Sequence, residues 1–278
     1  MRAPTPARLL QVWERGCDRP GATRALLLLE AANEDADADT LAALPVGRRD
    51  AMLIELHARL FREQIVGLAR CPECQIEVEA AFACEDLLAA ADPTGDDPAG
   101  DDPALPPANT AHALDIDGAI VRFRLPDSRD MLALHDHMQN QLHDHLHDGL
   151  RDGARDSRDD AQRSRDLLLA RCLLTIERDG ETQTVDTLSE TQIDTLAAAM
   201  AAADPLADLR LGFACPACGA TWEAGFDPVH FLWQELQHWA LRTLRDIDLI
   251  ARVYHWREAD ILALAPRRRR AYLELCGS

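Results

Sequence analysis

The chain has 278 residues, of which 47% are hydrophobic and 28% are charged, and its formal net charge at pH 7 is −19. This length and apolar content are typical of a globular protein with one or two domains. The negative charge argues against a nucleic-acid partner, because phosphate binding needs a cationic surface. The sequence has no run of 18 apolar residues and its N-terminus lacks a signal-peptide core, so we expect a cytoplasmic protein without a membrane span.

The negative charge is concentrated in the middle of the chain. The basic side chains of the whole sequence are arginines, and it contains no lysine. Residues 71–204 hold 29 acidic side chains against ten arginines, whereas the segments on either side are balanced. Within this middle part, residues 92–108 are rich in proline and aspartate and offer no core residues. This composition predicts a disordered acidic linker over residues 89–111.

The N-terminal segment is predicted to be helical. One helix is expected over residues 6–16, where Gly16 closes it, and a second over residues 21–32, where Ala and Leu on all sides indicate burial. The apolar spacing in residues 41–68 predicts one long or broken helix after Pro45, which would lead directly into the first cysteine pair.

Two short motifs, CPEC at residues 71–74 and CPAC at residues 215–218, are predicted to hold one structural zinc ion. Glu, Ala and Phe follow both motifs at matching positions, so the two segments read as halves of one site. Closing a loop of roughly 140 residues costs about 1.7 kcal/mol more than closing one of 20. Structural zinc contributes on the order of 10–16 kcal/mol, which is far more. The predicted ligands are Cys71, Cys74, Cys215 and Cys218.

Two redox dithiols, or plain buried cysteines, are the alternative interpretation of the same motifs. A thioredoxin-type pair follows a strand and opens a helix, whereas residues 75–82 and 219–226 look extended. The remaining cysteines are predicted to be small buried hydrophobes; they are Cys17, Cys84, Cys172 and Cys276.

The segment after the linker predicts a β-hairpin followed by helices. Apolar residues alternate with charged ones in residues 114–125, with a turn at Asp117-Gly118. Residues 127–170 are expected to start and end as helix around an insertion at 138–164 that is rich in His, Asp and Arg. The insertion contains histidines at metal-capable spacing, but no apolar residues surround them, so we interpret it as a solvated surface.

The C-terminal part contains the strongest helical pattern of the chain. Residues 228–254 follow one apolar face over about 40 Å and form the main core or partner-binding element. A short helix at 257–264 and a last helix from Pro266 follow. The only basic run opens that last helix, and it is a solvated face, a site for partner carboxylates, or a nucleic-acid contact. The candidate partner-binding residues are Trp233, Trp239, Trp256, Arg267, Arg268, Arg269 and Arg270.

We therefore expect an α+β, mostly helical fold. Its centre is a split zinc ribbon, with two CPxC turns and short antiparallel strands, surrounded by helices and followed by the long C-terminal helix. The expected units are an N-terminal helical segment with the first cysteine pair (1–88), the linker (89–111), a hairpin-and-helix unit with the insertion (112–204), and the second cysteine pair with the C-terminal helices (205–278).

No nucleotide-binding, hydrolase or zinc-protease motif occurs in the sequence. A zinc ion held by four thiolates has no open position for water, so the metal would be structural and not catalytic. We therefore expect a protein that is not an enzyme and has no small-molecule substrate.

Several segments in a fixed order resemble a known family. They are LPVGRRD at residues 44–50, the first cysteine pair, VRFRLP at 121–126 and CPACG at 215–219. Together they resemble the baseplate hub assembly chaperone family of T-even-type contractile phages.

The C-terminal segment carries a second likeness. Three segments are similar to the zinc-ribbon baseplate proteins encoded with phage-tail-like extracellular contractile injection systems. They are residues 226–233, YHWREADIL at residues 254–262 and RRRAYL at 268–273. The likeness covers most of the chain outside 89–111 and 138–164. It implies a non-enzymatic role in assembling, or forming part of, a baseplate hub, with baseplate or hub proteins as partners. The alternatives are a nucleic-acid-binding zinc-ribbon protein and a thiol oxidoreductase.

Overall fold

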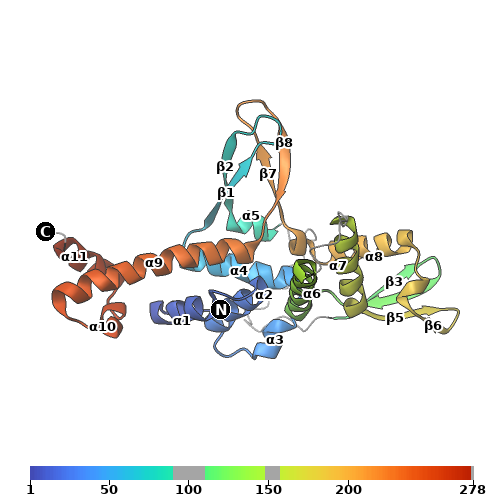
Figure 1. Ribbon diagram of the computed structural model, residues 1–278, viewed down its shortest axis with the longest axis horizontal. Coiled ribbons are helices and arrows are strands. Elements are labelled where there is room, and N and C mark those ends of the chain that lie inside the picture. Colours follow the sequence, from blue (N-terminus) through green and yellow to red (C-terminus); the bar gives the residue numbers. More distant parts are fainter. Residues whose placement is uncertain (90–109, 148–156, 277–278) are drawn as a thin grey trace.

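The computed structural model describes residues 1–89, 110–147 and 157–276. Most of the predicted linker at 89–111 and the centre of the predicted insertion therefore lie outside the described residues. Within the described ranges the protein is α+β and mostly helical, with three small antiparallel sheets (Figure 1). In this part of the chain no helix has the length and apolar character needed to cross a bilayer.

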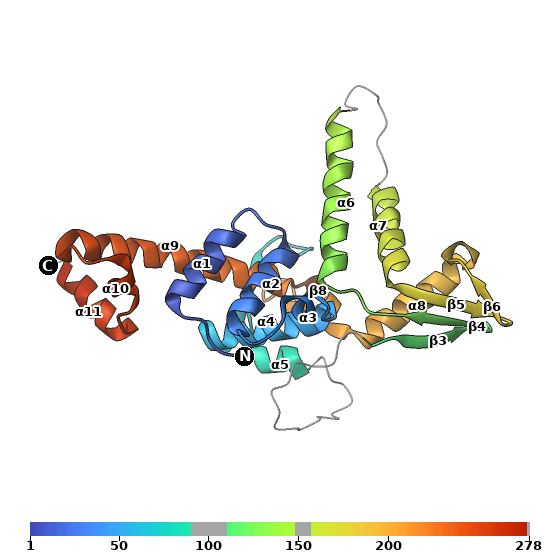
Figure 2. The same cartoon turned by 90° about the horizontal axis from the view of Figure 1, so that it is seen from below.

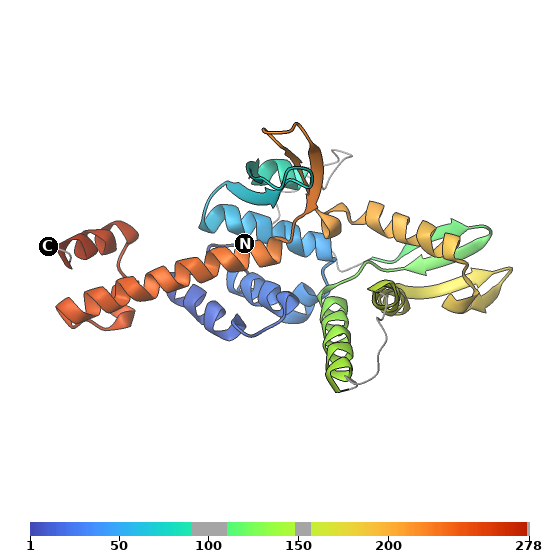
Figure 3. The same ribbon diagram turned by 45° about the horizontal axis from the view of Figure 1, so that its top comes forward.

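Four N-terminal helices and the first half of the long helix α9 form the main core (Figure 3). Their boundaries are Pro6–Gly16 (α1), Gly21–Ala32 (α2), Ala38–Ala42 (α3) and Val46–Leu60 (α4). Helix α9 spans Pro228–Tyr254, as its sequence pattern predicts, and Asp227 caps its N-terminus by accepting a hydrogen bond from the His230 N–H at 3.0 Å. Leu28, Leu53 and Leu236 are fully buried between these helices.

Trp233 of α9 lies at the centre of this core. It is 3% exposed, and the end of α1 approaches it so closely that a Cβ at Gly16 would overlap the indole ring. The Arg24 guanidinium lies 4.6 Å from the ring centroid and donates from Nε to the Gly16 carbonyl at 2.9 Å. Gly16 is thus required by this close approach and not by a left-handed conformation at the helix end, because its φ is not positive.

The prediction of one long or broken helix over residues 41–68 is wrong from residue 61 onward. Helix α4 ends at Leu60, and Gln64–Arg70 form strand β1, which pairs with β2 (Glu77–Ala83) as an antiparallel hairpin. The β-branched pair Ile65-Val66 favours an extended chain, and the following Gly67 is unfavourable inside a helix. Ile65 points into the core with 1% of its surface exposed, and this long-range burial decides for the strand.

A second hairpin, β7 (Arg210–Ala214) with β8 (Thr221–Gly225), lies beside the first on the same side of α4 and α9 (Figure 1). The Phe213 ring packs edge-on against Phe82 at 5.6 Å and stacks on Trp222 at 5.5 Å. The short helix α5 (Cys84–Ala89) and a 3-10 turn at Pro205–Asp208 lie at the base of the hairpins. The two hairpins therefore share one apolar cluster with α4.

A second lobe contains a four-stranded antiparallel sheet in sequence order. Its strands are β3 (His112–Ile116), β4 (Ala119–Phe123), β5 (Leu173–Arg178) and β6 (Glu181–Gln183). The predicted turn at Asp117-Gly118 is confirmed, with φ of 53° and 82° as a two-residue hairpin loop requires. After a 3-10 turn at Val185–Thr187, Ser189 caps helix α8 (Glu190–Ala203) with a capping box, and α8 packs on the sheet through Leu196.

Helices α6 (Ser128–His147) and α7 (Ser157–Cys172) project side by side from the end of this sheet (Figure 2). The described parts of the predicted insertion at 138–164 are therefore helical extensions of these two helices. At the opposite end of the molecule, α10 (Glu258–Leu262) and α11 (Pro266–Cys276) fold back on the C-terminal end of α9 (Figure 3).

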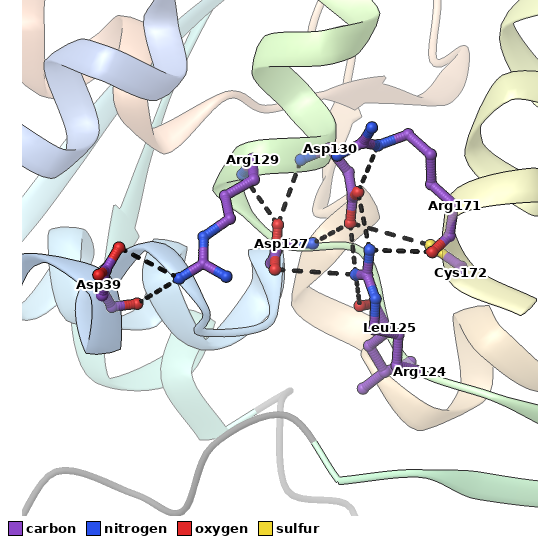
Figure 4. Close-up of polar contacts among 8 residues, drawn as sticks. All are labelled: Asp39, Arg124, Leu125, Asp127, Arg129, Asp130, Arg171 and Cys172. Atoms are coloured by element: carbon purple, nitrogen blue, oxygen red, sulfur yellow. Dashed lines mark hydrogen bonds and ion pairs between the residues drawn. The ribbon is translucent and has the colours of Figure 1, made fainter. Parts of the chain in front are cut away.

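A buried carboxylate joins the elements where the two lobes meet (Figure 4). Asp130 is fully buried at the start of α6 and accepts hydrogen bonds from Arg124 Nη2 at 2.9 Å and Arg171 Nε at 2.7 Å. Nearby, the Gly47 N–H at the start of α4 donates to Asp204 Oδ2 at 2.9 Å, and a Cβ at Gly47 would overlap that carboxylate. Donors from separate elements converge on Asp130, and Asp204 joins the end of α8 to the start of α4 through one hydrogen bond.

Replacing Asp130 by alanine is expected to lower the free energy of unfolding at pH 7 by about 3 kcal/mol, because two arginines lose their buried partner. Burial disfavours the ionised form, but hydrogen bonds from Arg124, the Asp127 backbone and Arg171 lower the pKa of Asp130 to about 2. Since the folded pKa is below the usual value, this stabilisation is complete above about pH 4 and is lost as the pH falls toward 2. Urea unfolding at pH 7 and pH 3 measures both effects.

The exposed pair of Asp248 and Arg252, 2.8 Å apart, provides the control for this prediction. Asp248→Ala is expected to change the unfolding free energy by less than about 1 kcal/mol. An Asp130→Ala variant no less stable than Asp248→Ala would contradict the role of the buried carboxylate.

Candidate metal centre

The two hairpin turns lie side by side at the end of the hairpins that points away from the helices (Figure 1). Each turn carries one CPxC motif, so the fold brings together the four cysteines that the sequence singles out. Their Sγ atoms all lie within 4.8 Å of one another. The separation is 3.6 Å between Cys71 and Cys218 and 3.5 Å between Cys74 and Cys215.

These distances fit a shared metal ion better than disulfide bonds. A disulfide needs an S–S distance of about 2.05 Å, and all four cysteines are free thiols. Four sulfurs at about 2.3 Å from a tetrahedral zinc ion are about 3.8 Å from each other. The observed separations between facing cysteines are close to that edge length, so the cluster could hold a metal ion without rearrangement of the backbone.

The two turns have the same backbone hydrogen bonds. In the first, the Cys71 N–H donates to the Ile76 carbonyl at 2.9 Å and the Gln75 N–H donates to the Cys71 carbonyl at 3.0 Å. In the second, the Cys215 N–H donates to the Ala220 carbonyl at 2.8 Å and the Gly219 N–H to the Cys215 carbonyl at 3.0 Å. The equivalent residues Gln75 and Gly219 both have positive φ, 61° and 75°. The left-handed conformation at Gln75 could not be predicted from the sequence, because glycine is the residue that indicates positive φ reliably.

The thiols of the cluster differ in pKa. At Cys74 and Cys218 the backbone N–H groups of Ile76 and Ala220 lower the thiol pKa, but contacts with the other cysteines outweigh them and raise it. At Cys215 the surroundings favour the thiolate form that metals bind. The backbone N–H groups of Cys218 and Ala217 point at the Cys215 sulfur and lower the pKa of this thiol to about 6. Cys71 and Cys215 are buried at the base of the cluster, whereas Cys74 and Cys218 are exposed at its tip. The donor set is therefore four sulfurs, two of them shielded from water.

A model of the family described as T4 bacteriophage base plate protein matches residues 24–233. The match spans about three quarters of the chain and includes both hairpins and all four cysteines. The chain belongs to this base plate family. No curated protein and no solved structure gave a match.

The match to the base plate family stops at residue 233, early in α9. The remainder of α9 and helices α10 and α11 lie beyond it. Most of the candidate partner-binding residues are in this C-terminal part of the base plate protein.

The three candidate tryptophans of the base plate protein differ in their burial. Trp233 belongs to the core, so it is not available to a partner. Trp239 is half-buried on α9. Trp256 is half-buried and packs on Tyr272 of α11 at 4.9 Å, which fixes α11 to the end of α9.

The four arginines of the basic run also differ in their burial. Arg269 is 8% exposed, whereas Arg267, Arg268 and Arg270 are exposed. The run is therefore not a uniformly solvated face.

Of the other cysteines, Cys84 and Cys172 are buried as predicted, while Cys17 and Cys276 are only half-buried.

Proposed function

We propose that this base plate family protein is a non-enzymatic assembly factor (chaperone) or structural component of the baseplate hub of a phage-tail-like contractile injection system. It acts in the cytoplasm, and its partners are baseplate or hub proteins. The family match carries the proposal, because it spans residues 24–233 and contains both cysteine turns. The resemblance of the C-terminal segment to zinc-ribbon baseplate proteins supports the same role.

The four cysteines are proposed to hold one structural zinc ion, which completes a split zinc ribbon. The support is the set of Sγ atoms within 4.8 Å and the matching hydrogen bonds of the two turns. Zinc, when bound, joins turns that are remote in the sequence by four metal–sulfur bonds. Four thiolates fill a tetrahedral zinc site, so it would have no open position for a substrate. This chemistry fits a clamp that presents surfaces to other proteins.

The proposed role can be tested by tagging the full chain in cells that assemble the particle. We expect hub or wedge proteins to co-purify with the tagged chain and not with an untagged control. An assembly factor would be found with assembly intermediates and be absent from finished particles, whereas a structural component would be found in both. Recovery of no tail component, together with normal particle assembly after deletion of the gene, would contradict both forms of the proposal.

A further inference from the structure

The C-terminal half of α9 and the start of α11 form a pocket with an unusual concentration of arginine. The two helices lie next to each other beyond the part of the chain that the base plate family covers (Figure 3). The pocket has a volume of about 410 Å³. Its charged lining consists of Arg242, Arg245, Arg269, Arg270 and Asp246, four positive groups against one negative.

Arg269 is the buried member of this arginine pocket. Only 8% of the residue is exposed, and its Nε is fully buried without a hydrogen-bond partner among the described residues. An unpaired buried guanidinium N–H is costly, because it has lost its water and gained no acceptor. Arg269 therefore adds to the pocket lining a positive charge that burial has largely removed from water, and a bound anion would stabilise it.

The acid in the pocket does not neutralise the arginines. Within the described part of the chain, none of the four arginines forms an ion pair with a carboxylate, Asp246 included. Burial raises the pKa of Asp246, while the charges of Arg269 and Arg242 act against that shift, so this one carboxylate is within electrostatic reach of two of the four arginines. An excess of positive charge remains for a ligand.

We propose that the arginine pocket binds an acidic segment of a partner protein through its carboxylate groups. Planar guanidinium groups pair with carboxylates through two parallel hydrogen bonds, which favours arginine at such sites. Trp239 and Leu273 line the same pocket and suit the apolar side chains next to an acid in a peptide. A nucleic acid is the less suitable polyanion, because the whole chain has a net charge of −19 and Asp246 lies in the site.

An apolar stripe on α9 continues from the pocket. Leu249 and Val253 follow Arg245 at intervals of four residues, so they lie on the same side of the helix. Their side chains are 49% and 50% exposed, and Leu241, one turn before Arg245, is 39% exposed. An acidic segment with apolar residues could therefore contact the stripe while its carboxylates enter the pocket.

The absence of lysine from the sequence allows a specific test, because one introduced lysine is the only side-chain amine in the chain. Arg270→Lys places this amine at the pocket. Arg122→Lys, at an exposed position of β4 in the other lobe, is the matched control. Carbodiimide couples an amine directly to a carboxylate, and mass spectrometry identifies both residues. In extracts of particle-assembling cells we expect R270K, and not R122K, to couple to an Asp or Glu of another protein.

A synthetic peptide containing the coupled carboxylate is then titrated against the purified full chain. Arg245→Glu is expected to weaken binding roughly tenfold or more, and amidation of the peptide's acidic residue to weaken it equally. Arg245 is exposed, so this variant should fold, whereas Arg269 variants disturb a buried position.

Four outcomes would overturn the proposal. They are coupling of R270K only to carboxylates of its own chain, equal coupling by R270K and R122K, peptide binding unchanged by Arg245→Glu, and low-salt DNA binding that Arg245→Glu removes without any coupling to a protein. Coupling to a protein outside the base plate would support the pocket but contradict the proposed function, so the two proposals fail separately.

Discussion

Replacing Cys215 by serine is expected to release the proposed zinc ion and to lower the melting temperature of the base plate protein by roughly 10 °C or more. Cys215 is a buried sulfur that faces Cys74 at 3.5 Å across the two turns. Without the metal, the turns lose four metal–sulfur bonds and are joined mainly through the apolar cluster at their base. A strong zinc chelator should lower the melting temperature of the wild-type chain to that of the variant and leave the variant unchanged.

Hydrogen exchange locates the effect of this substitution. Amide protection is expected to fall in β1–β2 and β7–β8 and to persist in α9, because the helical core has its own buried side chains. Cys276→Ser, at a half-buried cysteine on α11, is the control and should melt close to the wild type. A Cys215→Ser variant that melts with the wild type, together with a wild-type chain whose melting temperature the chelator does not change, would contradict the metal clamp.

Trp233→Ala is expected to reduce the free energy of unfolding by about 3–5 kcal/mol, as for other buried large-to-small changes. The indole is 3% exposed, contacts the end of α1 at Gly16 and lies under the Arg24 guanidinium. Its removal would leave a cavity between α1, α2 and α9 that the close helix packing cannot fill. Urea unfolding followed by circular dichroism measures the loss as a lower midpoint with an unchanged slope.

Trp239→Ala is the matched control on the same helix. Trp239 is half-buried, so its replacement should cost less, about 1–2 kcal/mol. Equal destabilisation by the two changes would contradict the difference in burial. Since Trp233 is part of the core, loss of partner binding in Trp233→Ala would report unfolding and not a lost contact.

Local signals in the sequence were sufficient for several elements. Pro228 after the capping residue Asp227 marks the start of α9, and the apolar face continues to Tyr254, where the helix ends. Asp117-Gly118 and Ser189 likewise specify a turn and a helix start from neighbouring residues alone. Each of these features is decided within a few residues, so a sequence pattern is enough to find it.

Features that depend on remote contacts were not predictable in the same way. Residues 61–68 have helix-compatible apolar spacing, and β1 forms there because Ile65 is buried between the hairpin and α4. The burial of Arg269 in a basic run depends on its packing against α9, which no local pattern encodes. The cysteine cluster was predictable despite its long loop, because two CPxC motifs have few alternative uses.

The metal content of the purified full chain, prepared without metal-affinity resin, tests the proposed clamp most directly. Elemental analysis by mass spectrometry should find one zinc ion per folded chain, and X-ray absorption should find four sulfur neighbours at about 2.3 Å. Folded protein that contains no zinc and has all four of Cys71, Cys74, Cys215 and Cys218 free to react with a thiol reagent would contradict it.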